Sequence, residues 1–211
     1  ERTVNHALET EKFSDAATAL YQFVWNDFCD WYIEFTKPIM TSASAPEKAA
    51  TQLVMAQVLN RMIRLLHPFC PFVTEEIYSN LPIRSDACIT DAYPTAENDH
   101  ELLAFGSRQA EFEIDIVKEV ITAIRNIRGE NRISPAIKLK IRLGVVQADV
   151  QKVLSHNRSA IMTIARLETM EIGGEGDLMK CAVAPVAVGD ARVKVIIPLE
   201  GLVDFNEEIK R

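Results

Sequence analysis

The stretch FVWNDFCDWYIEFTKP, residues Phe23–Pro38, decides the fold of this 211-residue chain. Ser14 followed by Asp15 is typical of the start of a helix that runs into it. Apolar side chains then recur with helical spacing, at Leu20, Val24, Phe28, Trp31 and Phe35, and a second stripe at Tyr21, Trp25 and Tyr32 widens the apolar face. A helix that is aromatic on two sides is predicted to lie at the centre of a bundle.

Further helices are expected on both sides of this stretch. Residues 3–11 have the pattern of a helix end, and residues 46–67 form an apolar-periodic run that begins at a proline. Pro68 and Pro71 predict a tight corner before the next helix, with Glu75 and Glu76 near its positive end. After a loop over 82–98, a long helix is expected from about residue 99 to residue 128.

The pattern changes after residue 135. Residues 137–143 alternate apolar and basic side chains, which is the period of a strand with one wet face. Short helices are expected over 147–154 and 157–165, a strand over 167–172, and a hairpin of strands over 181–188 and 192–197. The predicted fold class is therefore mainly α, an antiparallel bundle of four or five helices (1–134) followed by a small α/β domain (135–200). Residues 201–211 are expected to start a truncated C-terminal helix or coiled coil.

Composition excludes several classes of protein. The chain is 48% hydrophobic, has no apolar run long enough for a membrane span and begins with a charged segment, so we expect no membrane partner and a cytoplasmic location. Its four cysteines are scattered and are expected to be reduced. The net charge of −7 argues against a generic nucleic-acid binder, but residues 118–142 hold 7 basic against 2 acidic side chains.

No motif indicates catalysis or metal binding. Glu97 and His100 have the E-x-x-H spacing of di-iron bundles, but the motif occurs once. His67, before a proline at a helix end, is interpreted as structural. Nucleophile and phosphate-loop motifs are not found. We therefore predict no catalytic residues, no metal site and no cofactor within these 211 residues.

Three segments in fixed order resemble the anticodon-binding region of valyl-tRNA synthetases: residues 23–38, RMIRLLHPFCPFVTEEIY at 61–78 and IRNIRGENRISPAIKL at 124–139. The second also resembles the wider class I group that handles isoleucine and leucine. The resemblance implies a helical domain that grips the anticodon stem-loop, as part of a longer monomeric ligase that activates valine with ATP. The catalytic signatures His-Ile-Gly-His and Lys-Met-Ser-Lys-Ser are not in this chain, so it is not expected to form valyl-adenylate alone.

The predicted RNA contacts are chosen by charge and placement, because Arg is suited to phosphates and base edges. They are Lys37, Arg61, Arg64, Arg125, Arg128, Asn131 and Arg132. The row Arg125, Arg128 and Arg132 could equally pair with acidic residues of the bundle such as Asp27, Asp30 and Glu34. Two alternatives for the function stay open at this stage: the same region of an isoleucyl- or leucyl-tRNA synthetase, and a helical protein-interaction scaffold without an RNA role.

Overall fold

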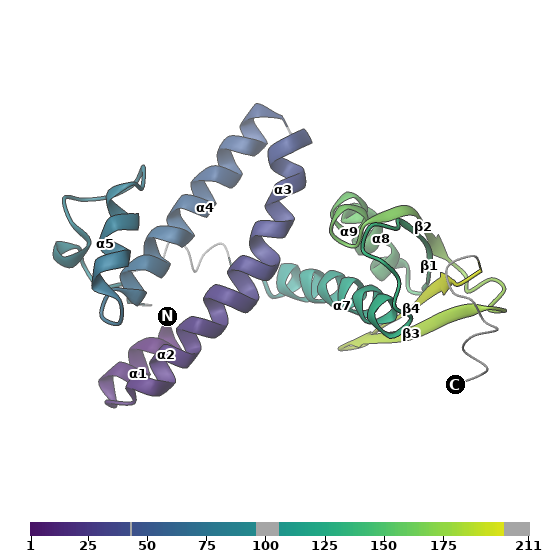
Figure 1. The fold of residues 1–211 in the computed structure, drawn as a ribbon, viewed down its shortest axis with the longest axis horizontal. Coiled ribbons are helices and arrows are strands. Elements are labelled where there is room, and N and C mark those ends of the chain that lie inside the picture. Colours follow the sequence, from purple (N-terminus) through teal and green to yellow (C-terminus); the bar gives the residue numbers. More distant parts are fainter. Residues whose placement is uncertain (43, 96–105, 201–211) are drawn as a thin grey trace. The chain divides into compact units, whose positions relative to one another are not determined.

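The computed structural model describes residues 1–42, 44–95 and 106–200 (Figure 1). The chain divides into two compact units, Glu1–Gly106 and Ser107–Arg211.

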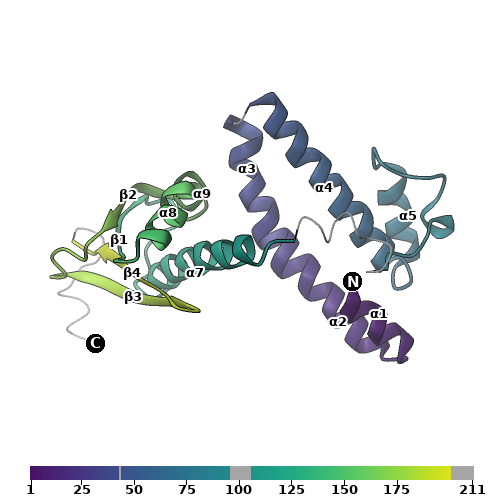
Figure 2. The same cartoon turned by 180° about the vertical axis from the view of Figure 1, so that it is seen from behind.

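The first unit is built on a continuous helical rod. Helix α2 (Phe13–Gln22) passes into a π-helical stretch, η1 (Phe23–Tyr32), and then into α3 (Ile33–Ser42) without a break (Figures 1 and 2). A short helix, α1 (Arg2–Glu9), packs against α2. Pro38 lies inside α3, where it removes one backbone donor from the helical ladder.

A second long helix, α4 (Ala45–Leu66), follows the rod. The Ser44 amide and hydroxyl donate to Glu47 Oε2 at 2.9 and 2.7 Å, which fixes the start of the helix. The predicted corner at Pro68 is confirmed, since α5 (Pro71–Ser79) begins at the next proline and is followed by a 3₁₀ turn, η2 (Cys88–Thr90). The expected helix from Pro46 to His67 is also confirmed within one residue at each end.

Among residues 1–42 and 44–95, two small apolar clusters stabilise this unit. One joins α1, α2 and the end of α4 through Val4, Ala7, Ala16, Leu20 and Leu65. The other joins α4, α5 and η2 through Ile63, Tyr78, Leu81 and Cys88. Tyr78 is fully buried, and its hydroxyl donates to Asp91 Oδ2 at 2.6 Å and accepts from the Ser85 amide at 2.9 Å. The loop after α5 is thus fixed to that helix by a buried polar group whose needs are met.

The second unit contains a mixed four-stranded sheet. Its strands are β1 (Leu139–Gly144), β2 (Leu167–Gly173), β3 (Cys181–Val188) and β4 (Ala191–Pro198), in the order β2-β1-β4-β3. Strands β1 and β2 are parallel and are connected through α8 (Ala148–His156) and α9 (Arg158–Ile164). The expected hairpin of β3 and β4 is confirmed, with Val188 opposite Ala191.

Helices cover one face of this sheet and charges cover the other. Helix α7 (Arg108–Glu130) packs on β3 and β4, while α8 and α9 contact β2. On the opposite face, Arg142 donates to Glu171 Oε2 at 2.9 Å, and Lys140 and Lys194 pair with Glu168 and Glu175. Two members of the basic run seen in the sequence, Lys140 and Arg142, are therefore paired with acidic side chains of β2.

The predicted fold class, an antiparallel helix bundle followed by a small α/β domain, is wrong. The long helix expected in the bundle is α7, and it belongs to the second unit, where its buried face packs on the sheet. Helical spacing showed that α7 has an apolar face but not which element covers it. The described residues form a set of helices and a mixed sheet with one helical layer, and not a clear bundle.

The central position predicted for the aromatic helix is also wrong. Trp25 is 55% exposed and Tyr21 is 65% exposed, and among residues 23–32 only Phe28 is buried. A π-helix advances each side chain by a smaller angle than an α-helix does, so residues spaced for an α-helical stripe spread around η1. The predicted domains 1–134, 135–200 and 201–211 stay predictions, and the last lies outside the described residues.

Candidate nucleic-acid interface

The predicted RNA contacts fall into two groups, one in each compact unit. Lys37 lies on α3, and Arg61 and Arg64 lie on α4. Arg125 and Arg128 lie on α7, and Asn131 and Arg132 follow its end. Three of the predicted residues thus lie on the first unit and four on the second.

Arg64 joins α4 to the loop after α5 inside the first unit. Its Nε lies 3.4 Å from Asp91 Oδ2, and its Nη1 donates to Asn60 Oδ1 at 3.2 Å. Its Nη2 donates to the carbonyl of Ala92. Asp91 also accepts the bond from Tyr78, so the Arg64 guanidinium and the buried phenol share one carboxylate. This network gives Arg64 a structural role whatever else it contacts.

Lys37 and Arg61 lie nearer the surface. Lys37 pairs with Glu34 one turn earlier on α3, and its side chain is 59% exposed. Arg61 Nη1 lies 3.5 Å from Glu1 Oε1. Arg61 also lines a cavity of about 720 Å³ with Glu1, Arg2 and Asp27. Acidic and basic groups are mixed there, so the cavity has no clear preference for an anion.

The end of α7 is a cationic segment in which each side chain has a different environment. Arg125 is exposed, and Asn131 Nδ2 donates to the Ile127 carbonyl at 2.8 Å, which caps the helix. Arg132 is exposed and has a left-handed backbone, with φ of 51°. Among the described residues its side chain makes no hydrogen bond or ion pair. Arg132 is thus the member of this group best placed to meet an external ligand.

Arg128 is bound to backbone carbonyls and not to acidic side chains. Its Nη2 donates to the carbonyls of Arg166 at 2.9 Å and Ala165 at 3.2 Å, and its Nη1 donates to those of Ile137 at 2.9 Å and Ser134 at 3.4 Å. Desolvation, followed by the charge of Arg166, lowers the pKa of Arg128. The planar fork of arginine suits this double contact, which joins residues 134–137 to the turn between α9 and β2.

These two segments border a basic cavity that sequence reasoning missed. The basic cavity has a volume of about 920 Å³ and lies wholly within the second unit. Its lining residues include four basic side chains, Lys138, His156, Arg158 and Arg166, and three hydroxyls, Ser155, Ser159 and Thr163. None of the residues that line it is acidic. No local motif marks these positions, because they come from three segments that meet only in the folded chain.

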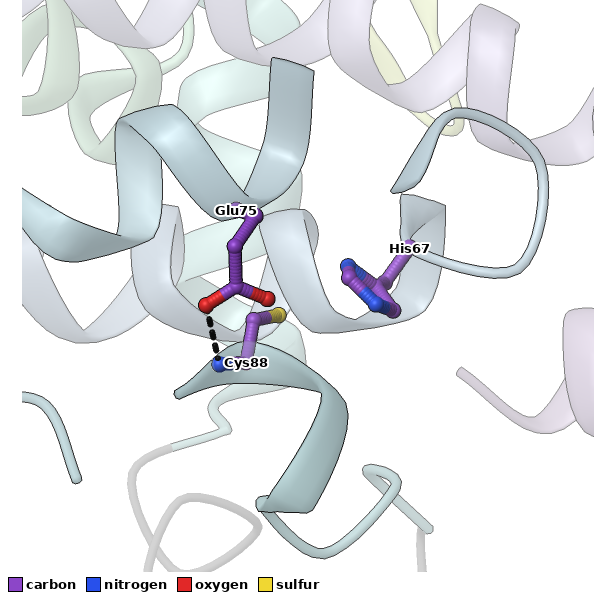
Figure 3. A group of neighbouring side chains, drawn as sticks. All are labelled: His67, Glu75 and Cys88. Carbon is purple, nitrogen blue, oxygen red and sulfur yellow. Dashed lines mark hydrogen bonds between the residues drawn. The ribbon is translucent and has the colours of Figure 1, made fainter. Parts of the chain in front are cut away.

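Three potential metal ligands also meet in the first unit. His67, Glu75 and Cys88 place one ligand atom each within 4.8 Å of one another (Figure 3). Both carboxylate oxygens of Glu75 already accept backbone amides, from Cys88 at 2.9 Å and Ile89 at 3.3 Å. His67 Nδ1 lies 2.8 Å from Thr74 Oγ1, while its Nε2 is buried without a partner among the described residues.

The bonds of this cluster have a structural explanation. Glu75 caps the η2 turn, and His67 is tied to the first turn of α5. Burial, and secondarily the charge of Glu75, raises the pKa of the Cys88 thiol and disfavours the thiolate that a metal needs.

The E-x-x-H motif, Glu97 and His100, lies outside the described residues. Over the described residues no helix is long and apolar enough to cross a membrane.

Comparison with known proteins gives a consistent result. A family model described as the anticodon-binding domain of tRNA ligase matches residues 1–143. Over 210 residues the chain is 71% identical to a valine–tRNA ligase of Bdellovibrio bacteriovorus. This match covers 100% of the chain and 24% of that ligase. Valine–tRNA ligases of Lactiplantibacillus plantarum and Geobacter sulfurreducens are 41% and 39% identical and cover 94% and 97% of the chain, each match spanning 22% of the relative.

The chain thus spans about a quarter of the length of these curated relatives. The match to valine–tRNA ligases extends over both compact units, while the family model reaches from α1 into β1. Because that model covers more than half of the residues, this chain belongs to the anticodon-binding domain family of tRNA ligases.

Proposed function

We propose that this chain recognises the anticodon stem-loop of tRNA as part of a valine–tRNA ligase. The observation that supports this most strongly is the 71% identity to a valine–tRNA ligase over the full chain. Such a ligase activates valine with ATP and transfers it to its tRNA. ATP would act in the parts of the ligase that correspond to the remaining three quarters of the relatives' length, and the recognition of RNA belongs to the residues described above.

We further propose that the seven predicted residues contribute to RNA binding in different ways. Arg132 and Lys37 have exposed side chains and are suited to direct contact with phosphates or base edges. Arg64 and Arg128 have most of their donors bound to the protein itself, so they hold the loops that surround them in place. Arg61, Arg125 and Asn131 complete the set. An unpaired anticodon loop offers splayed bases to such side chains, while its stem offers phosphates.

A binding experiment tests this proposal. Fluorescence anisotropy at low salt should show that the 211-residue chain prefers a valine anticodon hairpin over a hairpin of the same stem with a scrambled loop. Arg132→Ala should weaken binding, because it removes an exposed cation at the end of α7. Lys48→Ala is the control, since Lys48 is a partly exposed cation on α4 outside the predicted set. Equal binding of both hairpins would refute recognition of the anticodon.

A further inference from the structure

The basic cavity of the second unit concentrates unneutralised positive charge. Within the described residues, the side chains of Lys138, His156 and Arg158 make no hydrogen bond or ion pair. Among the same residues, the Arg166 side chain donates one bond, from Nη1 to the Pro135 carbonyl at 3.2 Å. By contrast, the lysines and Arg142 on the open face of the sheet are paired with carboxylates. In a chain with a net charge of −7, this cavity is a place where a polyanion can approach.

Hydrogen bonds hold part of the backbone around the cavity in place. Arg128 joins two of its three bordering segments through four hydrogen bonds to carbonyls. Arg166 has a left-handed backbone, with φ of 52°, which turns the chain from α9 into β2. Its carbonyl accepts from Arg128 at 2.9 Å and from the Leu139 amide at 3.3 Å. Lys138 and Arg166 therefore project from anchored backbone, so less freedom is lost there when a ligand binds.

The chemistry of the lining matches a phosphate backbone. Phosphate oxygens are bound in protein–nucleic acid complexes by Arg and Lys together with Ser and Thr hydroxyls, and both kinds of group line this cavity. Lys138, His156, Arg158 and Arg166 are all exposed, so the lining is open to a chain of phosphates and does not enclose a small anion. None of the lining residues is Phe, Tyr or Trp, so the cavity lacks the large aromatic rings on which successive bases stack in single-strand binders.

We propose that the basic cavity binds the phosphate backbone of tRNA, through Lys138, Arg158 and Arg166, as a second RNA contact independent of base sequence. The inference rests on tRNA as the partner of the chain. It places a contact in the region of α8, α9 and the start of β2, which contains none of the residues predicted from the sequence.

The double variant Lys138→Gln, Arg158→Gln tests the proposal in the 211-residue chain. It should weaken binding to the cognate and the scrambled hairpin by the same factor, and it should lower the slope of log affinity against log salt by about one for each phosphate that the variant no longer neutralises. Between about 50 and about 200 mM salt, the wild type should lose roughly tenfold more affinity than this variant. The control Lys180→Gln, Lys194→Gln removes the same charge outside the cavity.

A second measurement does not depend on anticodon recognition. A short RNA duplex without a loop should shift the backbone amide signals of residues 155–166 in a ¹⁵N-labelled chain. Millimolar inorganic phosphate should not reproduce these shifts. Shifts with phosphate but not with RNA would reduce the cavity to a free-anion site, and no shift with RNA would overturn the proposal. If the duplex shifts these signals while both hairpins bind equally, anticodon recognition fails and the cavity stands.

Discussion

Replacing Arg128 tests whether one guanidinium holds together the second unit. Arg128→Met keeps a similar unbranched stem but removes all four hydrogen bonds to the carbonyls of Ser134, Ile137, Ala165 and Arg166. Two of these bonds measure 2.9 Å, and a well-formed hydrogen bond contributes roughly 1 kcal/mol to stability. Counting only those two bonds, we expect the variant to lose about 2 kcal/mol of unfolding free energy.

The distribution of tryptophan makes the assay specific. Both tryptophans, Trp25 and Trp31, lie in the first unit, so their fluorescence reports unfolding there, whereas far-UV circular dichroism reports both units. In urea, Arg128→Met should move the dichroism transition to lower denaturant while the fluorescence midpoint changes little. Arg128→Lys should lose most of the same stability, because an ammonium group cannot reach both segments as the planar fork does.

The control is Arg132→Lys, an equivalent exchange at an exposed side chain four residues later. It should leave both transitions within about 0.5 kcal/mol of the wild type, as is usual for surface substitutions. An Arg128→Met chain as stable as that control would refute the reasoning, since the four carbonyl contacts would then contribute nothing measurable.

Two further predictions concern the first unit. Tyr78→Phe removes the donor to Asp91 and the acceptor for the Ser85 amide inside a fully buried site. The variant should lose roughly 1–2 kcal/mol of unfolding free energy, and tryptophan fluorescence should report a lower urea midpoint. A midpoint equal to that of the wild type would contradict this prediction. Burial and the charge of Glu75 raise the pKa of Cys88, so the thiolate fraction of Cys88 near pH 8 is reduced. Iodoacetamide should therefore label Cys88 more slowly than the less buried Cys181, which peptide mass spectrometry can follow. Faster labelling of Cys88 would count against this account.

Local structure could be predicted from the sequence where one kind of residue dominates the outcome. The prolines at 46, 68 and 71 and the alternation over 137–143 predicted the start of α4, the corner before α5 and strand β1. These features depend on φ restriction or on a two-residue period, and both act within a few residues. The sequence did not predict which elements pack against each other, because the apolar face of α7 could have packed on helices as well as on the sheet.

The surroundings of the selected residues could not be predicted from the sequence. Charge alone selected Arg128, but its donors meet carbonyls of segments that are 6 to 38 residues away in the sequence. Arg158 and Arg166 were not selected, since nothing near them in sequence distinguishes a lining residue from an ordinary surface cation. Arg158 and Arg166 are recognised as lining residues only in the folded chain, where residues 135–138 lie beside the ends of α8 and α9. Whether the selected residues touch RNA stays a prediction.

The π-helical winding of η1 has a consequence for how the rod tolerates change. A π-helical segment holds more residues per turn than the α-helices at either side of it, so the loss of one residue there can be absorbed by tighter winding. The buried faces of α2, at Ala16 and Leu20, and of α3, at Thr36, would then keep their own neighbours. The π-helical stretch can thus accommodate a one-residue deletion without changing which residues of α2 and α3 are buried.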